Sequence, residues 1–175
     1  MSWVLVIVML PALELPLQQI KDARKYTLSL LEDLEPGDWF RMPSEGVTHI
    51  GWQVGHMAMA QFRLCLERLR NLQPGDWDLI SKNDLRRFAK GSTPEDNASA
   101  YPGPEEIRAM LDRVFDAVVR EVPQYEGDDL DTPLVNPHPI FKTKLEALYF
   151  CSKHEMLHAG QIGLLRRLMG KPPLR

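Results

Sequence analysis

The stretch Cys151-Ser-Lys-His-Glu-Met-Leu-His-Ala-Gly-Gln-Ile162 carries two of the five histidines of the chain inside a long helix-like segment. At ~100° per residue, His154 and His158 lie ~40° apart on one face of that helix. Apolar side chains share this face, and polar ones such as Lys153 and Arg166 fall on the other side. Because buried polar groups need partners, two imidazoles within an apolar stripe predict a shared metal ion.

Composition and charge are those of an ordinary globular domain. The chain has 175 residues, of which 44% are hydrophobic and 26% charged, and its formal net charge is −3. This length suits one domain with a sizeable core. Because like charges form no block, we expect neither nucleic acid nor a membrane as a partner. Two cysteines far apart do not form a disulfide framework, so we expect a reducing, cytoplasmic compartment.

The N-terminal stretch Trp3 to Leu13 is almost wholly apolar. We therefore expect an apolar extension at residues 1–15 and a single domain at residues 16–175. A run this short does not span a bilayer, which takes roughly 20 apolar residues. A signal peptide would have a basic start, but no Lys or Arg precedes Lys21. A segment packed on the domain, an upstream extension with the true start near Met9, and a secretory signal stay open as interpretations.

Helical periodicity and helix-breaking residues predict four long helices and no strand. The expected ranges are 16–34, 48–71, a segment between Pro102 and Pro123, and 142–169. An all-α chain with four amphipathic helices predicts a four-helix bundle. A connection of about 30 residues joins the second and third helices, with a short helix expected at 77–89. Because this connection is long enough to cross the bundle, the topology need not be a simple up-down-up-down arrangement.

Residues 154–158 match the HExxH pattern of zinc proteases. Those proteases take their third ligand from downstream, but none of the 17 residues after this motif is His, Asp or Glu. A third histidine ligand must therefore come from upstream, where the candidates are His49, His56 and His138. The prolines on either side of His138 predict a surface loop. His56 shares one side of its helix with Arg63, and this projection alone predicts an exposed imidazole.

Two segments of the chain, taken together, resemble the DinB-like family of bacterial proteins. They are Ile50-Gly-Trp-Gln-Val-Gly-His-Met-Ala58 and His154-Glu-Met-Leu-His-Ala-Gly-Gln-Ile162. The stretches from Phe88 to Ser92 and from Tyr101 to Ile107 resemble the family as well. The match covers roughly residues 16–170, and it implies a four-helix bundle with a metal bound by three histidines.

The resemblance implies both the ligands and a class of chemistry. The ligands would be His56, His154 and His158, and the ion would be zinc or nickel, with iron as an alternative. Three neutral imidazoles leave a coordination position open, which is a property of catalytic metal sites. Similar proteins include transferases and isomerases that use a low-molecular-weight thiol. The implied function is a metal-dependent enzyme of this small-thiol type, acting on a small-molecule substrate.

Other functions and further site residues stay open. The same ion could serve a hydrolase that activates water, or a protein that binds a metal or ligand without catalysis. Glu155, next to a ligand, is the candidate general base. Gln161, one turn after His158, is a candidate to hydrogen-bond a ligand or substrate. Many similar proteins are dimers, so the resemblance adds a homodimer through a helix face as an expectation.

Overall fold

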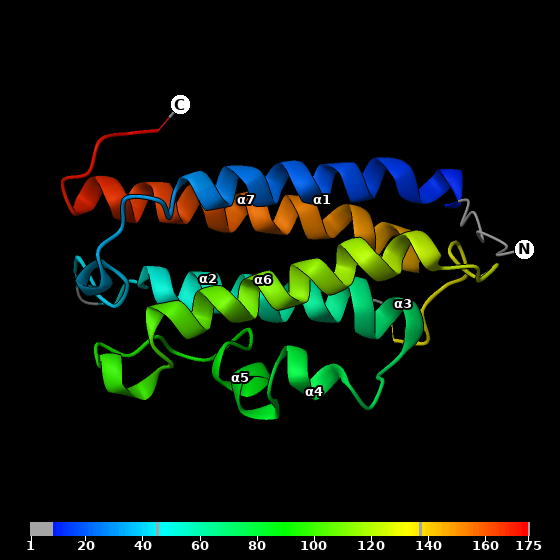
Figure 1. Ribbon diagram of the computed structural model, residues 1–175, viewed down its shortest axis with the longest axis horizontal. Coiled ribbons are helices and arrows are strands. Elements are labelled where there is room, and N and C mark those ends of the chain that lie inside the picture. Colours follow the sequence, from blue (N-terminus) through cyan, green and yellow to red (C-terminus); the bar gives the residue numbers. More distant parts are fainter. Residues whose placement is uncertain (1–8, 45, 137, 175) are drawn as a thin grey trace, which may run out of the picture.

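A computed structural model describes residues 9–44, 46–136 and 138–174. Four long helical segments lie side by side (Figure 1). They are α1 Pro11–Ser29, α2 Ile50–Phe62 with its continuation, α6 Pro104–Glu121 and α7 Lys144–Leu168. The continuation of α2 is a π-helical turn, η2 Arg63–Glu67, followed by α3 Arg68–Arg70. The described residues contain no strand, only one isolated bridge, so the predicted all-α class is confirmed.

The predicted crossover lies between α3 and α6. In Figure 1, α2 and α6 run in the same direction, opposite to α1 and α7. The chain must therefore return along the bundle between α3 and α6, and it does so on the outside of α2 and α6. This connection contains α4 Asp76–Leu79 and α5 Lys82–Arg87, and α5 packs against α2. Short 3-10 turns occur at η1 Pro36–Asp38, η3 Ala98–Ala100 and η4 Val122–Gln124.

The first helix begins and ends earlier than the sequence pattern predicts. Pro11 occupies the first turn of α1, where a missing N–H costs no hydrogen bond. Leu13 is fully buried, and the turn that carries it continues without a break into the predicted first helix. The remainder of the predicted extension, residues 1–8, lies outside the described residues. Among the described helices, none is long and apolar enough to cross a membrane.

The N-caps of the other helices agree with the predicted starts to within a few residues. The start of α2 differs in detail, because its N-cap is His49 and not Thr48. Nδ1 of His49 accepts a hydrogen bond from the backbone N–H of Trp52 at 3.0 Å. At the start of α7, the Thr143 side chain accepts from the backbone N–H of Glu146 in the same manner.

The core lies between the four long helical segments. Its fully buried members include Ile20 of α1, Val54 of α2, Leu111 and Val114 of α6, and Ile162 of α7. Burying one such side chain stabilises the fold by ~1.5–3 kcal/mol. Because α2 and α7 pack against each other within this core, the packing also sets the separation of the polar residues that the two helices direct toward each other.

Candidate metal centre

Three histidines from two helices meet between α2 and α7. His56 lies in the second turn of α2, and His154 and His158 lie in successive turns of α7. Nε2 of His56 is 3.3 Å from Nε2 of His154, and Nε2 of His154 is 3.2 Å from Nε2 of His158. Ligand nitrogens of all three rings lie within 4.8 Å of one another. The structure therefore brings together the three histidines expected to bind metal.

The spacing of these nitrogens fits one bound ion. Zinc binds histidine nitrogen at ~2.0–2.1 Å with tetrahedral angles, which places two ligand nitrogens ~3.3 Å apart. Three imidazoles are also donors that nickel, iron and copper accept. A tetrahedral ion with three protein ligands keeps one position for an external group. The cluster can therefore hold a divalent ion and present it to a small molecule.

Hydrogen bonds on the far side of two rings orient their lone pairs. Nδ1 of His56 donates to the carbonyl oxygen of Phe88 at 2.7 Å, and Nδ1 of His158 donates to the side-chain oxygen of Gln53. Both partners are acceptors, so the ring hydrogen lies on Nδ1. The lone pair of Nε2 then faces the centre, which is the arrangement seen when an outer partner supports a metal-binding histidine.

Burial keeps these imidazoles neutral at neutral pH. The pKa of His154 is lowered to about 4 and that of His158 to about 3, chiefly by burial and then by the neighbouring imidazoles. Burial also lowers the pKa of His56, and the hydrogen bond to Phe88 opposes this shift in part. Since the neutral ring is the form that binds metal, protons do not compete for the site near pH 7.

His56 is buried although its helical side also carries Arg63. The sequence pattern predicts exposure there, but the crossover connection lies against this side of α2, and the backbone carbonyl of Phe88 at the end of α5 bonds to the ring. Phe88 approaches closely because residue 55 is glycine. A Cβ atom at Gly55 would lie 2.4 Å from a carbon of the Phe88 ring. The burial of His56 therefore depends on a segment that lies 32 residues further along the chain.

Aromatic rings enclose two of the histidines. Trp52 stacks on His56 with ring centroids 4.7 Å apart and an interplanar angle of 12°. The indole Nε1–H of Trp52 donates to Ser92 at 2.9 Å, which fixes the ring against the crossover connection. Phe150 packs edge-on against His154 at 5.6 Å. These rings exclude water from the sides of the cluster, whereas His154 and His158 are only half-buried.

Glu155, the predicted general base, lies in the core and outside the histidine cluster. One oxygen of its carboxylate lies 2.8 Å from Nε of Arg24, and both side chains are almost fully buried. Arg24 also donates to the carbonyl oxygen of Leu111 at 3.0 Å and to the Gln61 side chain at 2.9 Å. The helical angle between Glu155 and His154 directs them to different neighbours, so the structure does not place this carboxylate beside the imidazoles.

Gln161 and the other two histidine candidates have separate positions. Gln161 is exposed beside His158, where its side chain partly opposes the lowering of the imidazole pKa. His49 caps α2 and packs against aromatic rings away from the cluster. His138 is half-buried in the loop before α7, and its ring stacks on Phe141 at 4.5 Å.

Sequence reasoning missed two hydrogen-bond partners of the clustered imidazoles. Gln53 lies three residues before His56, and this spacing places it on the same side of the helix. A glutamine at that spacing within an apolar helix was the available signal. Phe88 acts through its backbone carbonyl, so the type of its side chain carries no sign of this role.

The fold and site thus define an all-α bundle with three converging histidines on its second and last long helices. A family model for the DinB superfamily matches residues 19–162, which is most of the chain and includes all three histidines. The chain belongs to the DinB superfamily. No curated protein matches the chain.

Proposed function

We propose that this protein is a metal-dependent enzyme whose centre binds one divalent ion through His56, His154 and His158. The observation that carries this proposal is the convergence of three neutral imidazoles at the nitrogen spacing of a tetrahedral ion. Without an ion, Nε2 lone pairs would face one another at this distance with too few hydrogens to pair them all. Zinc and nickel are the proposed ions, with iron as the alternative.

The residues around the ligands have distinct proposed roles. When bound, a divalent ion lowers the pKa of a coordinated water or thiol and so supplies a nucleophile near neutral pH. Phe88 and Gln53 hold two imidazoles in the orientation for binding, and Trp52 keeps solvent from one side. Gln161, at the exposed edge of the cluster, is proposed to hydrogen-bond the substrate.

We propose transfer or isomerisation with a small thiol as the reaction class. Neutral histidine ligands leave the full charge of the ion at the centre, and this charge favours an anionic group such as a thiolate. Many metal-dependent hydrolases add a carboxylate base that takes the proton of the metal-bound water, but no carboxylate among the described residues joins the cluster. Glu155 could supply such a base only after leaving Arg24. A thiol is far more acidic than water, so coordination to the ion is enough to deprotonate it near neutral pH.

Metal content tests the centre. Purified protein is loaded with zinc or nickel, and bound metal is measured by mass spectrometry of the ion. We expect about one ion per chain, lost in His154→Ala and in His158→Ala. His138→Ala is the matched control, because this histidine lies outside the cluster, and it should keep the ion. Unchanged metal content in both ligand variants would overturn the proposal.

Thiol dependence tests the reaction class. Metal-loaded protein is incubated with an electrophilic probe and, separately, with glutathione, bacillithiol or mycothiol, and the thiol adduct is quantified. We expect adduct formation that disappears in His154→Ala. Cleavage of an ester probe without any thiol would instead support a hydrolase. Absence of turnover with every pair would support a protein that binds its ligand without catalysis.

A further inference from the structure

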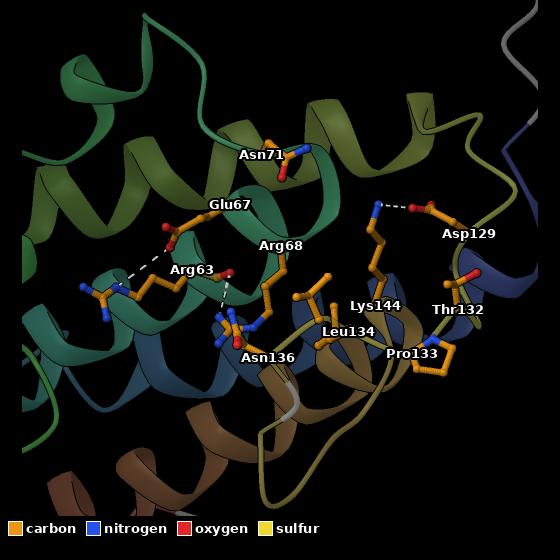
Figure 2. Close-up of a pocket in the computed structure, with 11 residues that line it drawn as sticks. Arg63, Glu67, Arg68, Asn71, Asp129, Thr132, Pro133, Leu134, Asn136 and Lys144 are labelled. Atoms are coloured by element: carbon orange, nitrogen blue, oxygen red, sulfur yellow. Dashed lines mark hydrogen bonds and ion pairs between the residues drawn. The ribbon is translucent and has the colours of Figure 1, made fainter.

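A polar pocket of about 660 Å³ lies between the C-terminal part of the α2 to α3 segment and the loop that precedes α7 (Figure 2). We call it the Arg68 pocket. Its charged and amide lining side chains include Arg63, Glu67, Arg68, Asp129, Asn136 and Lys144. None of these residues belongs to the histidine cluster, so the pocket needs its own explanation.

Two of the three cations in the pocket already have partners. Nζ of Lys144 lies 2.6 Å from the Asp129 carboxylate and also donates to the hydroxyl of Tyr125 at 3.0 Å. Nε of Arg63 lies 4.0 Å from the Glu67 carboxylate. Each of these cations therefore has a neighbouring carboxylate that neutralises it within the pocket.

Arg68 differs from both. Its guanidinium donates to the carbonyl oxygen of Arg63 at 3.3 Å and lies over the Phe141 ring at 5.1 Å. Within the described ranges, no carboxylate forms an ion pair with it. The side chain is half-buried, and burial lowers its pKa. A desolvated guanidinium with free N–H groups is the side chain that binds carboxylate or phosphate in proteins.

Neutral donors lie on the opposite wall. The side chains of Asn136 and Thr132 make no hydrogen bond to other described residues, and both line the pocket. Figure 2 shows the Arg68 side chain directed toward the part of the loop that carries Asn136. A guanidinium and an amide facing one space can donate to the same oxyanion, and a neutral ligand would leave the guanidinium charge unmatched.

Aromatic rings connect this pocket to the metal centre. Phe141, under Arg68, lies 5.5 Å from Phe150, and Phe150 packs against His154 at 5.6 Å. The Arg68 guanidinium reaches back to the carbonyl oxygen of Arg63, and seven residues separate Arg63 from His56 along α2, a rise of ~10 Å. An extended molecule of ordinary cosubstrate size is long enough to cover this distance.

We propose that the Arg68 pocket binds the oxyanion end, a carboxylate or a phosphate, of the substrate or thiol whose reactive atom reaches the three-histidine centre. This inference rests on the proposed function, because it treats the two places as parts of one binding site. Arg68 contributes a two-pronged hydrogen bond, and Asn136 completes the contact. The substrate class is therefore an extended anionic molecule, and a short neutral thiol binds only at the centre.

Mercaptoacids of different chain length test the separation between the Arg68 pocket and the three-histidine centre. Cobalt-loaded protein is titrated with mercaptoundecanoate and with mercaptopropionate, each beside the mercaptoalcohol of equal length, and binding is followed by the sulfur-to-cobalt absorption band. We expect the long acid to bind at least ~10-fold more tightly than the long alcohol, since a charge-assisted hydrogen bond is added. The short acid should show no such advantage, because its carboxylate does not reach Arg68.

Substitutions at Arg68 then test whether its side chain causes the tighter binding of the long acid. Arg68→Met keeps the packing on Phe141 and should remove the advantage of the long acid, whereas Arg68→Lys should restore part of it. Arg86→Gln, an exposed arginine on α5, is the control and should leave the advantage unchanged. An equal advantage in wild type and Arg68→Met, or none in wild type although the sulfur band appears, overturns the inference.

The outcome is separable from failure of the proposed function. If no thiol gives a sulfur-to-metal band, the thiol chemistry is wrong, and the pocket is then tested with inorganic phosphate by calorimetry. Phosphate binding that Arg68→Met weakens ~10-fold or more supports an oxyanion site without reference to thiols. Phosphate binding that Arg68→Met leaves unchanged, or no binding at all, overturns the site as well.

Discussion

Gln53 uses both ends of its side-chain amide to hold the His158 ring. The amide oxygen accepts from Nδ1 of His158, and the amide nitrogen donates to the hydroxyl of Thr48 at 3.0 Å. Because Gln53 is almost fully buried, water cannot replace it easily. The orientation of the His158 ring therefore depends on a chain of two hydrogen bonds that begins at Thr48, just before α2.

We expect Gln53→Leu to lower metal affinity by ~10–100-fold without removing the site, as outer partners of metal-binding histidines do. The stoichiometry should stay at one ion per chain. Competition with a chromophoric chelator measures the affinity. Gln18→Leu, at an exposed glutamine of α1, is the matched control. Equal affinity in Gln53→Leu and the control would show that the amide does not support the ligand.

His49 lies outside the histidine cluster, and its charge state affects the stability of the fold. It is fully buried, caps α2 through Nδ1, and lies 4.7 Å from the Tyr101 ring. Burial lowers its pKa from 6.5 to about 4. The unfolded chain therefore binds a proton at this residue more readily than the folded chain. The free energy of unfolding consequently decreases as the pH falls from 6.5 toward 4.

Acid sensitivity should accordingly decrease in His49→Asn, which keeps an N-capping side chain without a group that titrates in this range. Metal-free protein is unfolded with urea from about pH 7 to about pH 4. We expect the wild type to lose up to about 3 kcal/mol more than the variant over this window. Parallel losses in both proteins would exclude His49 as a cause of acid sensitivity.

At the scale of elements, the contact between α2 and the end of α5 closes the metal centre. Gly55 permits this contact, since a Cβ atom there would overlap the Phe88 ring. Gly160 of α7 is also helical, but a Cβ atom at that position would meet nothing within 4 Å. Substitutions at the two glycines therefore test different effects. Residue 55 tests packing against Phe88, and residue 160 tests only the lower helix propensity of glycine.

We expect Gly55→Ala to destabilise the fold by ~1–3 kcal/mol, because Phe88 must move in a filled core. Movement of its carbonyl should also weaken metal binding. Gly160→Ala should instead raise stability by ~0.5–1 kcal/mol, since alanine is the better helix former. Urea unfolding and chelator competition measure both effects. If Gly55→Ala instead raised stability, the end of α5 would be able to move away from α2 without loss of stability.

Element boundaries show what local pattern can predict. Periodicity and breaking residues were sufficient for α6, because Pro104 starts it, Pro123 follows its end, and its apolar stripe is regular. They failed for α1, since Pro16 looks like a helix start but lies inside the helix. Proline within the first two turns disturbs few hydrogen bonds, so tertiary packing of Leu13 decided the start.

The metal ligands were predictable to different degrees. His154 and His158 share an apolar stripe, so one helix projection was enough to select them. His56 needed the family resemblance, because its own helix projection indicates exposure, and the connection that buries it carries no pattern directed at α2. The pairing of Glu155 with Arg24 was also beyond local pattern, as the two residues are 131 positions apart.

At the scale of the whole molecule, one buried network ties the four long segments together. Arg24 of α1 contacts Glu155 of α7, Gln61 of α2 and the Leu111 carbonyl of α6. Charges removed from water need this degree of pairing, and loss of one partner leaves the other unmatched. The network therefore links the packing of all four segments in one place.

Removing either charge should destabilise the protein by ~3–5 kcal/mol. We expect this loss for Arg24→Met and for Glu155→Gln, and a smaller loss for the double variant Arg24→Met with Glu155→Leu. Urea unfolding gives the three values. Glu155→Gln should still bind one ion per chain, because its carboxylate pairs within the core. A stable Glu155→Gln variant that has lost its ion would place the carboxylate at the centre after all.

The homodimer stays a prediction, and α7 offers a surface for it. Leu157, Leu164 and Leu168 are 65%, 49% and 56% exposed along this helix. Contiguous exposed apolar side chains mark interaction surfaces. We expect light scattering to give the mass of two chains, and Leu157→Glu with Leu164→Glu to give one chain that keeps its ion. A wild-type mass of one chain would contradict the dimer.

The π-helical turn Arg63–Glu67 sets the direction of the side chains that follow it relative to those that precede it on the same helix. Such a turn holds one residue more than an α-helical turn, so each later side chain is rotated by ~100° about the axis. His56 lies before this insertion, and Arg68 lies after it. Deleting one residue within the turn would leave the histidine in place and rotate the arginine away from its pocket. The length of a single turn thus determines whether the proposed metal site and the proposed anion site face the same molecule.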